Sequence, residues 1–288
     1  LIFTVDEETN MTGALSLSAD HVKDAKYVIN CDSESIHVIC VASAGSCHME
    51  FTRDLHRCAP TGDTALTVRA HALAGGHSGE VINEGRGNAI KAVADVLYRL
   101  SEGGVEYALA DYKGGVAANA IPSDASAVVV VAAKDVDRVK ATVAAAEKDF
   151  NLVYGETDPN AVFEVTPADL PKSVLSAEDT TSIVDVINLL HCGVFAMDRR
   201  LPRLPALSAS LGTIETREDV LAFQYFPRSS SDARLQALVR VMPVMAKSTG
   251  TKVHIEKPFP AWTESKNSKL QALMADAYKD VMGKEPRV

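Results

Sequence analysis

The sequence has 288 residues, of which 29 are Lys or Arg and 38 are Asp or Glu, so its formal net charge is −9. Its 47% hydrophobic and 23% charged residues are typical of a folded globular protein and exclude disordered and collagen-like chains. The acidic balance also argues against a nucleic acid partner, because neutralising phosphates requires clustered Lys and Arg side chains.

The apolar runs are too short to cross a membrane. The longest, at residues 125–133 and 183–190, fall well below the roughly 20 residues that a spanning helix needs. Five cysteines without a CxxC pair indicate neither a disulfide framework nor a thiolate zinc site, so we expect a cytoplasmic protein. No initiator Met or basic leader precedes Leu1, and we expect the chain to be an internal fragment of a longer protein.

Two short apolar segments at the start of the chain, 1–5 and 27–31, predict strands that end in acidic residues. Asp6-Glu7-Glu8 follows the first segment, and Asp32-Ser33-Glu34 follows the second. Ligands of open α/β sheets bind at the carboxyl ends of strands, so this region predicts part of a doubly wound catalytic domain. Adjacent carboxylates repel one another unless cations compensate, so the acidic groups are explained either by a divalent metal such as zinc or manganese, or by a solvated turn.

The central part of the chain has the pattern of a ferredoxin-like β-α-β-β-α-β unit. An apolar stripe at positions 90, 93, 94 and 97 predicts a helix over 88–100, and an Asp cap predicts a second helix over 135–150. Strands are predicted at 65–73, 107–112, 125–133 and 161–165.

A second α+β unit follows residue 176. A Ser with an acidic residue three positions later predicts a helix over 176–190, and further helices are predicted at 232–247 and 268–282. Strands are predicted at 206–215, 220–226 and 252–256. We therefore expect an α/β catalytic domain in two parts, 1–45 and 259–288, that flank an α+β lid or dimerisation domain at 46–258.

Three polar loops follow predicted strands. In Gly75-Gly76-His77-Ser78-Gly79 the glycines permit a tight backbone path that projects the imidazole of His77 outward. The same loop is open to interpretation as a phosphate-binding turn or a plain glycine loop, although it lacks the P-loop Lys and does not match GxGxxG. Asn119 and Arg228 lie in the other two loops and offer donors suited to a carboxylate, but such loops are more often turns and caps.

The motifs resemble a known family in their order along the chain. Phe3-Thr-Val-Asp-Glu-Glu8, Asn30-Cys-Asp-Ser-Glu34, Gly75-Gly-His-Ser-Gly79, Asn119-Ala-Ile-Pro122 and Arg228 occur as in the bacterial Xaa-His dipeptidases, also called aminoacyl-histidine dipeptidases or peptidase D. These enzymes are co-catalytic zinc peptidases, related to carboxypeptidase G and peptidase T. The resemblance covers essentially the whole sequence, and it implies a dipeptide substrate and a homodimer that forms through the lid domain.

The resemblance also implies a role for each motif residue. Glu7 would be the general base, and Glu8 and Asp32 would each ligate one of two zinc ions, with manganese or cobalt as alternative metals. His77 would reach the scissile carbonyl from the lid of a partner subunit, while Asn119 and Arg228 would hold the terminal carboxylate of the substrate. The implied reaction is hydrolysis of the peptide bond of Xaa-His dipeptides by a metal-activated water.

Other functions remain open from the sequence. An N-acyl amino acid amidohydrolase of the same superfamily would use the same metals and base. The family's His-x-Asp pair, its bridging Asp and its final His lie outside these 288 residues, so we expect the chain alone to bind zinc weakly and to hydrolyse little. A non-catalytic dimerisation module is therefore the third possibility.

Overall fold

The computed structural model describes residues 1–7, 11–32, 36–199, 204–262, 265 and 267–287. The chain divides into two compact units, one formed by 1–41 with 264–288 and the other by 42–263. Among the described residues, no helix is long and apolar enough to cross a membrane. The division into domains at 1–45, 46–258 and 259–288 stays a prediction.

The unit 42–263 is built from two β-α-β-β-α-β repeats. The first repeat consists of β4 (Thr64–His71), α2 (Ala89–Glu102), β6 (Tyr107–Gly114), β8 (Ala125–Val131), α3 (Val136–Tyr154) and β9 (Val162–Ala168). The second repeat consists of β2 (Met49–Asp54), α4 (Ala177–Leu189), β12 (Pro205–Thr216), β13 (Val220–Ser229), α5 (Asp232–Ser248) and β14 (Lys252–Ile255). The first repeat is therefore inserted into the second, between its first strand and its first helix.

The two repeats share one continuous antiparallel sheet. Its strand order is β14-β2-β13-β12-β6-β8-β4-β9, so each repeat contributes its strands in the same internal order and the two meet at their second strands. At this junction Ile214 pairs with Gly114 and Glu215 with Lys113. Short strands extend or flank the sheet: β1 (Gly45–Ser46), β3 (Arg57–Cys58), β5 (Gly76–His77), β7 (Ala120–Ile121), β10 (Val174–Leu175) and β11 (Gly193–Met197).

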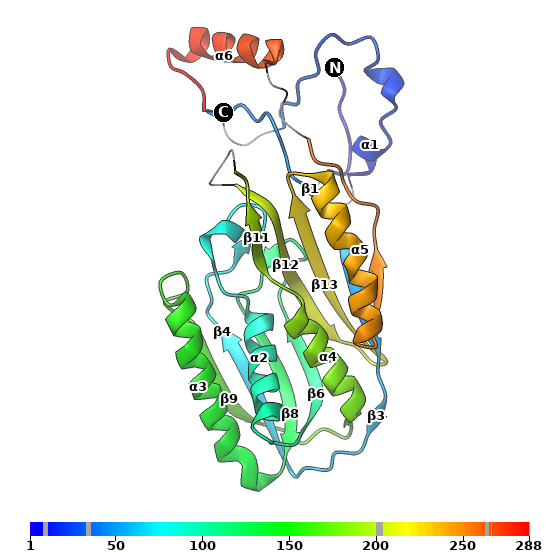
Figure 1. Ribbon diagram of the computed structural model, residues 1–288, viewed down its shortest axis with the longest axis vertical. Helices are drawn as coiled ribbons and strands as arrows, with labels where there is room; N and C mark the ends of the chain where they lie inside the picture. Colours follow the sequence, from blue (N-terminus) through cyan, green and yellow to red (C-terminus); the bar gives the residue numbers. More distant parts are fainter. Residues whose placement is uncertain (8–10, 33–35, 200–203, 263–264, 266, 288) are drawn as a thin grey trace. The chain divides into compact units, whose positions relative to one another are not determined.

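All four helices of the repeats cover one face of the sheet (Figure 1). The stripe that predicts α2 is completely buried, because Ile90, Val93, Ala94 and Leu97 are each 0% exposed. In the second repeat Phe51 and Phe223 stack across neighbouring strands with their ring centroids 5.1 Å apart. Burying one such side chain contributes about 1.5–3 kcal/mol, so these side chains hold the helix layer against the sheet.

The unit formed by 1–41 and 264–288 differs from the sequence expectation. It contains α1 (Thr12–Leu15), the 3₁₀ turn η1 (Ala19–His21) and α6 (Lys269–Met282), but its described residues form no strand at 1–5 or 27–31. A strand needs a hydrogen-bonding neighbour, and the described residues of this unit offer only a bridge between Val38 and Arg287. Phe3 and Ile29 are therefore 88% and 52% exposed.

Candidate functional site

The glycine motif lies in the loop 72–88, which connects β4 to α2. Gly75 and Gly76 have φ angles of +60° and +122°, which favour glycine, so the chain can turn sharply just before His77. The loop then pairs with the neighbouring loop 115–124 through β5 and β7, where His77 faces Ala120 in the register. This pairing fixes the glycine motif beside the loop that carries Asn119.

Ser78 links the two loops directly. Its backbone N–H and its hydroxyl both donate to the carbonyl oxygen of Asn119, at 2.8 and 2.9 Å. Ser78 itself is buried, at 3% exposed, whereas its neighbour His77 and its partner Asn119 are both exposed. The arrangement leaves an imidazole and a primary amide at the surface with their backbones held in place.

Arg228 comes from the other repeat and reaches the same place. It lies near the end of β13, and its guanidinium carbon is 3.3 Å from the position that a Cβ atom on Gly79 would take. The imidazole of His77 is 3.0 Å from the same position. The missing side chain of Gly79 thus leaves the space in which His77 and Arg228 come together, so both repeats contribute to one site within a single chain.

The surroundings of Arg228 leave its charge without a partner among the described residues. Its guanidinium lies over the ring of Phe226 at 4.6 Å, and its Nε is buried without a hydrogen-bond acceptor. Burial lowers the pKa of Arg228 from its ordinary value, because the charged form loses its hydration. A partly buried guanidinium of this kind is suited to bind a carboxylate, which would supply the absent acceptor.

Sequence analysis did not identify the residues that support Arg228. Phe226 also contacts His48, whose ring centroid lies 6.0 Å away in an edge-to-face arrangement. His48 is fixed in turn by Glu256, since its Nδ1 lies 2.8 Å from a carboxylate oxygen. Phe226 lies in β13, His48 just before β2 and Glu256 just after β14, so no local sequence signal brings these residues together.

Close packing at the junction of the repeats holds the loop 115–124. A Cβ atom on Gly212 of β12 would lie 2.3 Å from the carbonyl oxygen of Ala118, and a Cβ atom on Gly115 would lie 1.9 Å from that of Gly212. Only glycine allows the two backbones to approach this closely. The loop that carries Asn119 therefore rests directly on the strand that joins the repeats.

The expected metal ligands, Glu8 and Asp32, and the expected general base, Glu7, belong to the other unit. Glu7 and Asp32 are exposed, and the backbone N–H of Asp32 donates to the side chain of Asn30 at 2.9 Å. Glu8 lies outside the described residues. Within the part of the chain that the structure describes, no three His, Cys, Asp or Glu side chains gather into a metal-binding group, so these residues alone do not fit a complete zinc site.

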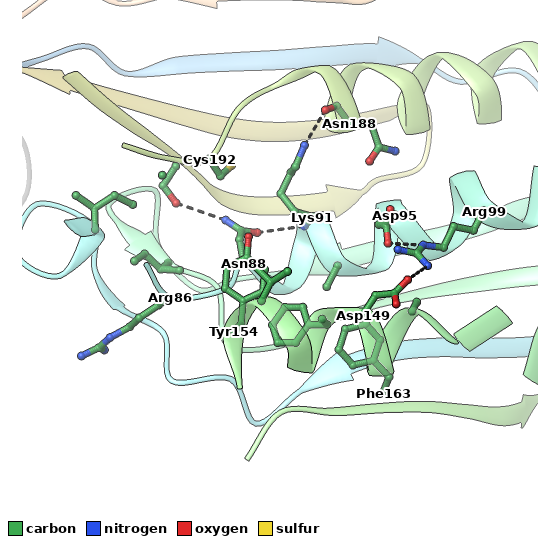
Figure 2. Close-up of a pocket in the computed structure, with 18 residues that line it drawn as sticks. Arg86, Asn88, Lys91, Asp95, Arg99, Asp149, Tyr154, Phe163, Asn188 and Cys192 are labelled. Carbon is green, nitrogen blue, oxygen red and sulfur yellow. Dashed lines mark hydrogen bonds and ion pairs between the residues drawn. The ribbon is translucent and has the colours of Figure 1, made fainter. Parts of the chain in front are cut away.

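Away from this site, a cavity of about 290 Å³ lies among α2, α3 and α4 (Figure 2). Its polar groups already have partners within the protein. Lys91 donates to the carbonyls of Ile187, Asn188 and Leu190 at 2.7–2.8 Å, and Arg99 donates to Asp95 and Asp149. Lys91 therefore joins α2 of the first repeat to the end of α4 in the second, and we assign this cavity a structural role.

Comparisons with known proteins agree with this architecture. Residues 70–158 match the family described as the peptidase dimerisation domain. The cytosol non-specific dipeptidase of Escherichia coli is 27% identical over 291 residues, which cover all of this chain and 59% of that protein. The crystal structure of aminoacylhistidine dipeptidase from Vibrio alginolyticus is 26% identical and superposes with a TM-score of 0.87, over 98% of this chain and 58% of that one.

These relatives establish the fold class expected from the sequence, an α/β architecture combined with an α+β dimerisation domain. The chain spans slightly less than three fifths of the length of either relative. The chain therefore contains a peptidase dimerisation domain and is a homologue of the dipeptidases.

Proposed function

We propose that the full-length protein is a metal-dependent dipeptidase, and that it hydrolyses dipeptides of the Xaa-His type. The observation that supports this proposal most directly is the guanidinium of Arg228, whose buried Nε has no acceptor among the described residues and which lies beside the imidazole of His77. Dipeptides have a terminal carboxylate only a few ångströms from the scissile carbonyl, so these two groups match the charge pattern of the substrate. Both relatives named above are dipeptidases.

The chain's own residues would divide the work by chemistry. The guanidinium of Arg228 binds the terminal carboxylate with two parallel hydrogen bonds, and the amide of Asn119 donates a further one. His77 donates to the carbonyl oxygen as that oxygen gains negative charge, which stabilises the transition state more than the ground state. Glu7 accepts the proton of the attacking water.

Zinc is the proposed metal, with manganese or cobalt as alternatives. Glu8 and Asp32 are its proposed ligands in this chain, one for each of two ions. A divalent ion would supply activation of the attacking water. Two carboxylates cannot complete the coordination of two metal ions, so further ligands must come from elsewhere in the full-length protein.

The proposed assembly is a cytoplasmic homodimer. A peptidase dimerisation domain is present, but its β6 edge is already paired with β12 of the same chain. A second copy must therefore use another surface. His77 and Arg228 meet within one chain, so their joint action does not require a partner subunit.

Substrate profiling of the full-length protein tests the proposal. We expect hydrolysis of Xaa-His dipeptides, loss of that activity after chelation with EDTA, and its recovery when zinc is added. The variant Glu7→Gln should retain the fold and lose at least 99% of the activity. Preferential cleavage of N-acyl amino acids would favour the amidohydrolase alternative, and absence of any metal-dependent hydrolysis would favour the non-catalytic module.

A further inference from the structure

The loop that presents His77 is closed at its base by a buried aspartate that the sequence motifs do not include. Asp158 lies in the turn after α3, and it is 1% exposed. We propose that Asp158 is a positioning residue for His77, which acts by clamping the two ends of the loop 72–88. The proposal rests on the function proposed above, because it assigns the loop a catalytic purpose.

Each carboxylate oxygen of Asp158 holds one end of the loop. Oδ1 accepts the backbone N–H of Ala74 at 2.8 Å, and Oδ2 accepts the backbone N–H of Gly87 at 2.7 Å. The preceding residue adds a weaker, shared contact, since the hydroxyl of Thr157 lies 3.2 Å from the carbonyl oxygen of Gly85, 3.1 Å from that of Tyr154 and 3.2 Å from Oδ2 of Asp158. One turn of the chain thus fixes the backbone on both sides of His77.

The loop needs such a clamp because its own conformation is unfavourable. Ala72 has a φ angle of +59°, which costs a residue with a Cβ about 1–2 kcal/mol, and Gly85 has a φ angle of +73°. Further along, the loop is held through the short β5–β7 pairing and through Ser78. The imidazole of His77 is exposed, so packing around the side chain does not fix its position. That position depends on the backbone of the loop.

The chemistry of Asp158 fits the role of a clamp. Its partners among the described residues are the backbone N–H groups of Ala74 and Gly87 and the hydroxyl of Thr157, so hydrogen-bond donors compensate its negative charge. A carboxylate accepts hydrogen bonds at both oxygens, whereas an amide accepts at one and donates at the other. Asp158→Asn therefore releases one end of the loop and keeps the size of the side chain.

Asp179 provides a matched control at a different place in the fold. It is also a buried aspartate, 0% exposed, and it also accepts a backbone N–H, that of His56 at 2.6 Å. These partners are Arg53 of β2 and the backbone N–H of His56, just after that strand, and neither lies in the loop 72–88. Asp179→Asn therefore disturbs a buried aspartate without releasing His77.

The experiment measures kcat/KM of the full-length, zinc-loaded protein with an Xaa-His dipeptide. We expect Asp158→Asn to lower kcat/KM by about 10- to 100-fold, mostly through kcat, because His77 acts on the scissile carbonyl. Asp179→Asn should change kcat/KM by less than twofold at a temperature well below its unfolding transition. Equal losses in the two variants would overturn the proposal.

A double-mutant cycle separates positioning from general stability. In the background of His77→Ala, Asp158→Asn should lower kcat/KM by less than a further twofold, because the residue that it positions is absent. Full multiplication of the two effects would contradict the proposed mechanism. If Asp158→Asn does not fold, Thr157→Val replaces it. This variant should lower kcat/KM two- to fivefold, and it should have no further effect in the background of His77→Ala.

Hydrogen exchange provides a readout that does not require activity. Peptides that cover residues 74–87 should exchange faster in Asp158→Asn than in the wild type. In Asp179→Asn the same peptides should exchange at the wild-type rate. A wild-type protein without dipeptidase activity would refute the proposed function, while the exchange rates would still decide whether Asp158 holds the loop. Unchanged exchange in Asp158→Asn would overturn the inference.

Discussion

The ion-pair network around Asp179 is expected to contribute strongly to the stability of the second repeat. Asp179 accepts hydrogen bonds from Nε of Arg53 at 2.7 Å and from the backbone N–H of His56 at 2.6 Å. Arg53 is 9% exposed and also donates to Glu178 at 3.0 Å. The network ties β2 to α4 across the point at which the first repeat is inserted, so it joins segments far apart in the sequence.

The variant Asp179→Asn should therefore be strongly destabilised. It leaves the buried guanidinium of Arg53 without its main counter-charge, and breaking a buried pair in this way costs about 3–5 kcal/mol. For a domain of this size the melting temperature should fall by about 6–20 °C. Asp54→Asn is the control, because Asp54 pairs with Lys252 at the surface and both side chains are more than 60% exposed. We expect that variant to lose less than about 1 kcal/mol in free energy of unfolding.

The same network predicts a dependence on pH. Burial raises the pKa of Asp179, but hydrogen bonds from His56 and Arg53 outweigh it, so the pKa lies below its ordinary value. The contribution of ionised Asp179 to the free energy of unfolding is therefore fully present above the pKa of the unfolded state, about 3.9. It is lost as the pH falls through the lower pKa of the folded state. Urea unfolding at pH 7, 5, 4 and 3 should show the wild type converging on Asp179→Asn under acidic conditions. The reasoning would be refuted if the difference in free energy of unfolding between the wild type and Asp179→Asn stayed constant with pH. It would also be refuted if that difference were no larger than the one for Asp54→Asn.

Two glycine substitutions test the geometry of the candidate site. Gly79→Ala places a methyl group within 3.3 Å of His77 and Arg228, whose ends can move, so we expect kcat/KM of the full-length enzyme to fall about tenfold. Its melting temperature should stay within 2 °C, or about 1 kcal/mol, of the wild type, and unchanged turnover would show that this space is not used. Gly212→Ala meets backbone atoms at 2.3 Å, so calorimetry should show a loss of about 1–3 kcal/mol, and a neutral result would contradict the close packing of the repeats.

Local signals explain why the helices could be predicted from the sequence. The expected helix over 176–190 forms as α4 (Ala177–Leu189), and the hydroxyl of Ser176 accepts the N–H of Asp179 as a cap. The last helix begins after Ser268, whose hydroxyl accepts the N–H of Gln271. Caps and apolar stripes depend on residues three or four positions apart, so they can be recognised without knowledge of the fold.

The features that depend on distant residues could not be predicted in this way. The strands expected at 1–5 and 27–31 are apolar, but apolar sequence cannot form a strand without a neighbouring strand. The insertion of one repeat into the other is equally hidden, because β2 lies more than a hundred residues before α4. For the site, the motifs of His77, Asn119 and Arg228 were recognisable in the sequence, whereas Asp158 and His48 reach their surroundings only through tertiary contacts.

The carboxylate-binding role of Arg228 is the central claim about the site, and one comparison tests it directly. The full-length enzyme is assayed with an Xaa-His dipeptide and with the same dipeptide as its C-terminal amide, which lacks the negative charge. We predict that the wild type prefers the free carboxylate by at least 100-fold in kcat/KM, and that Arg228→Gln reduces this preference to less than tenfold. An undiminished preference in Arg228→Gln would show that the carboxylate binds elsewhere and would contradict the proposed site.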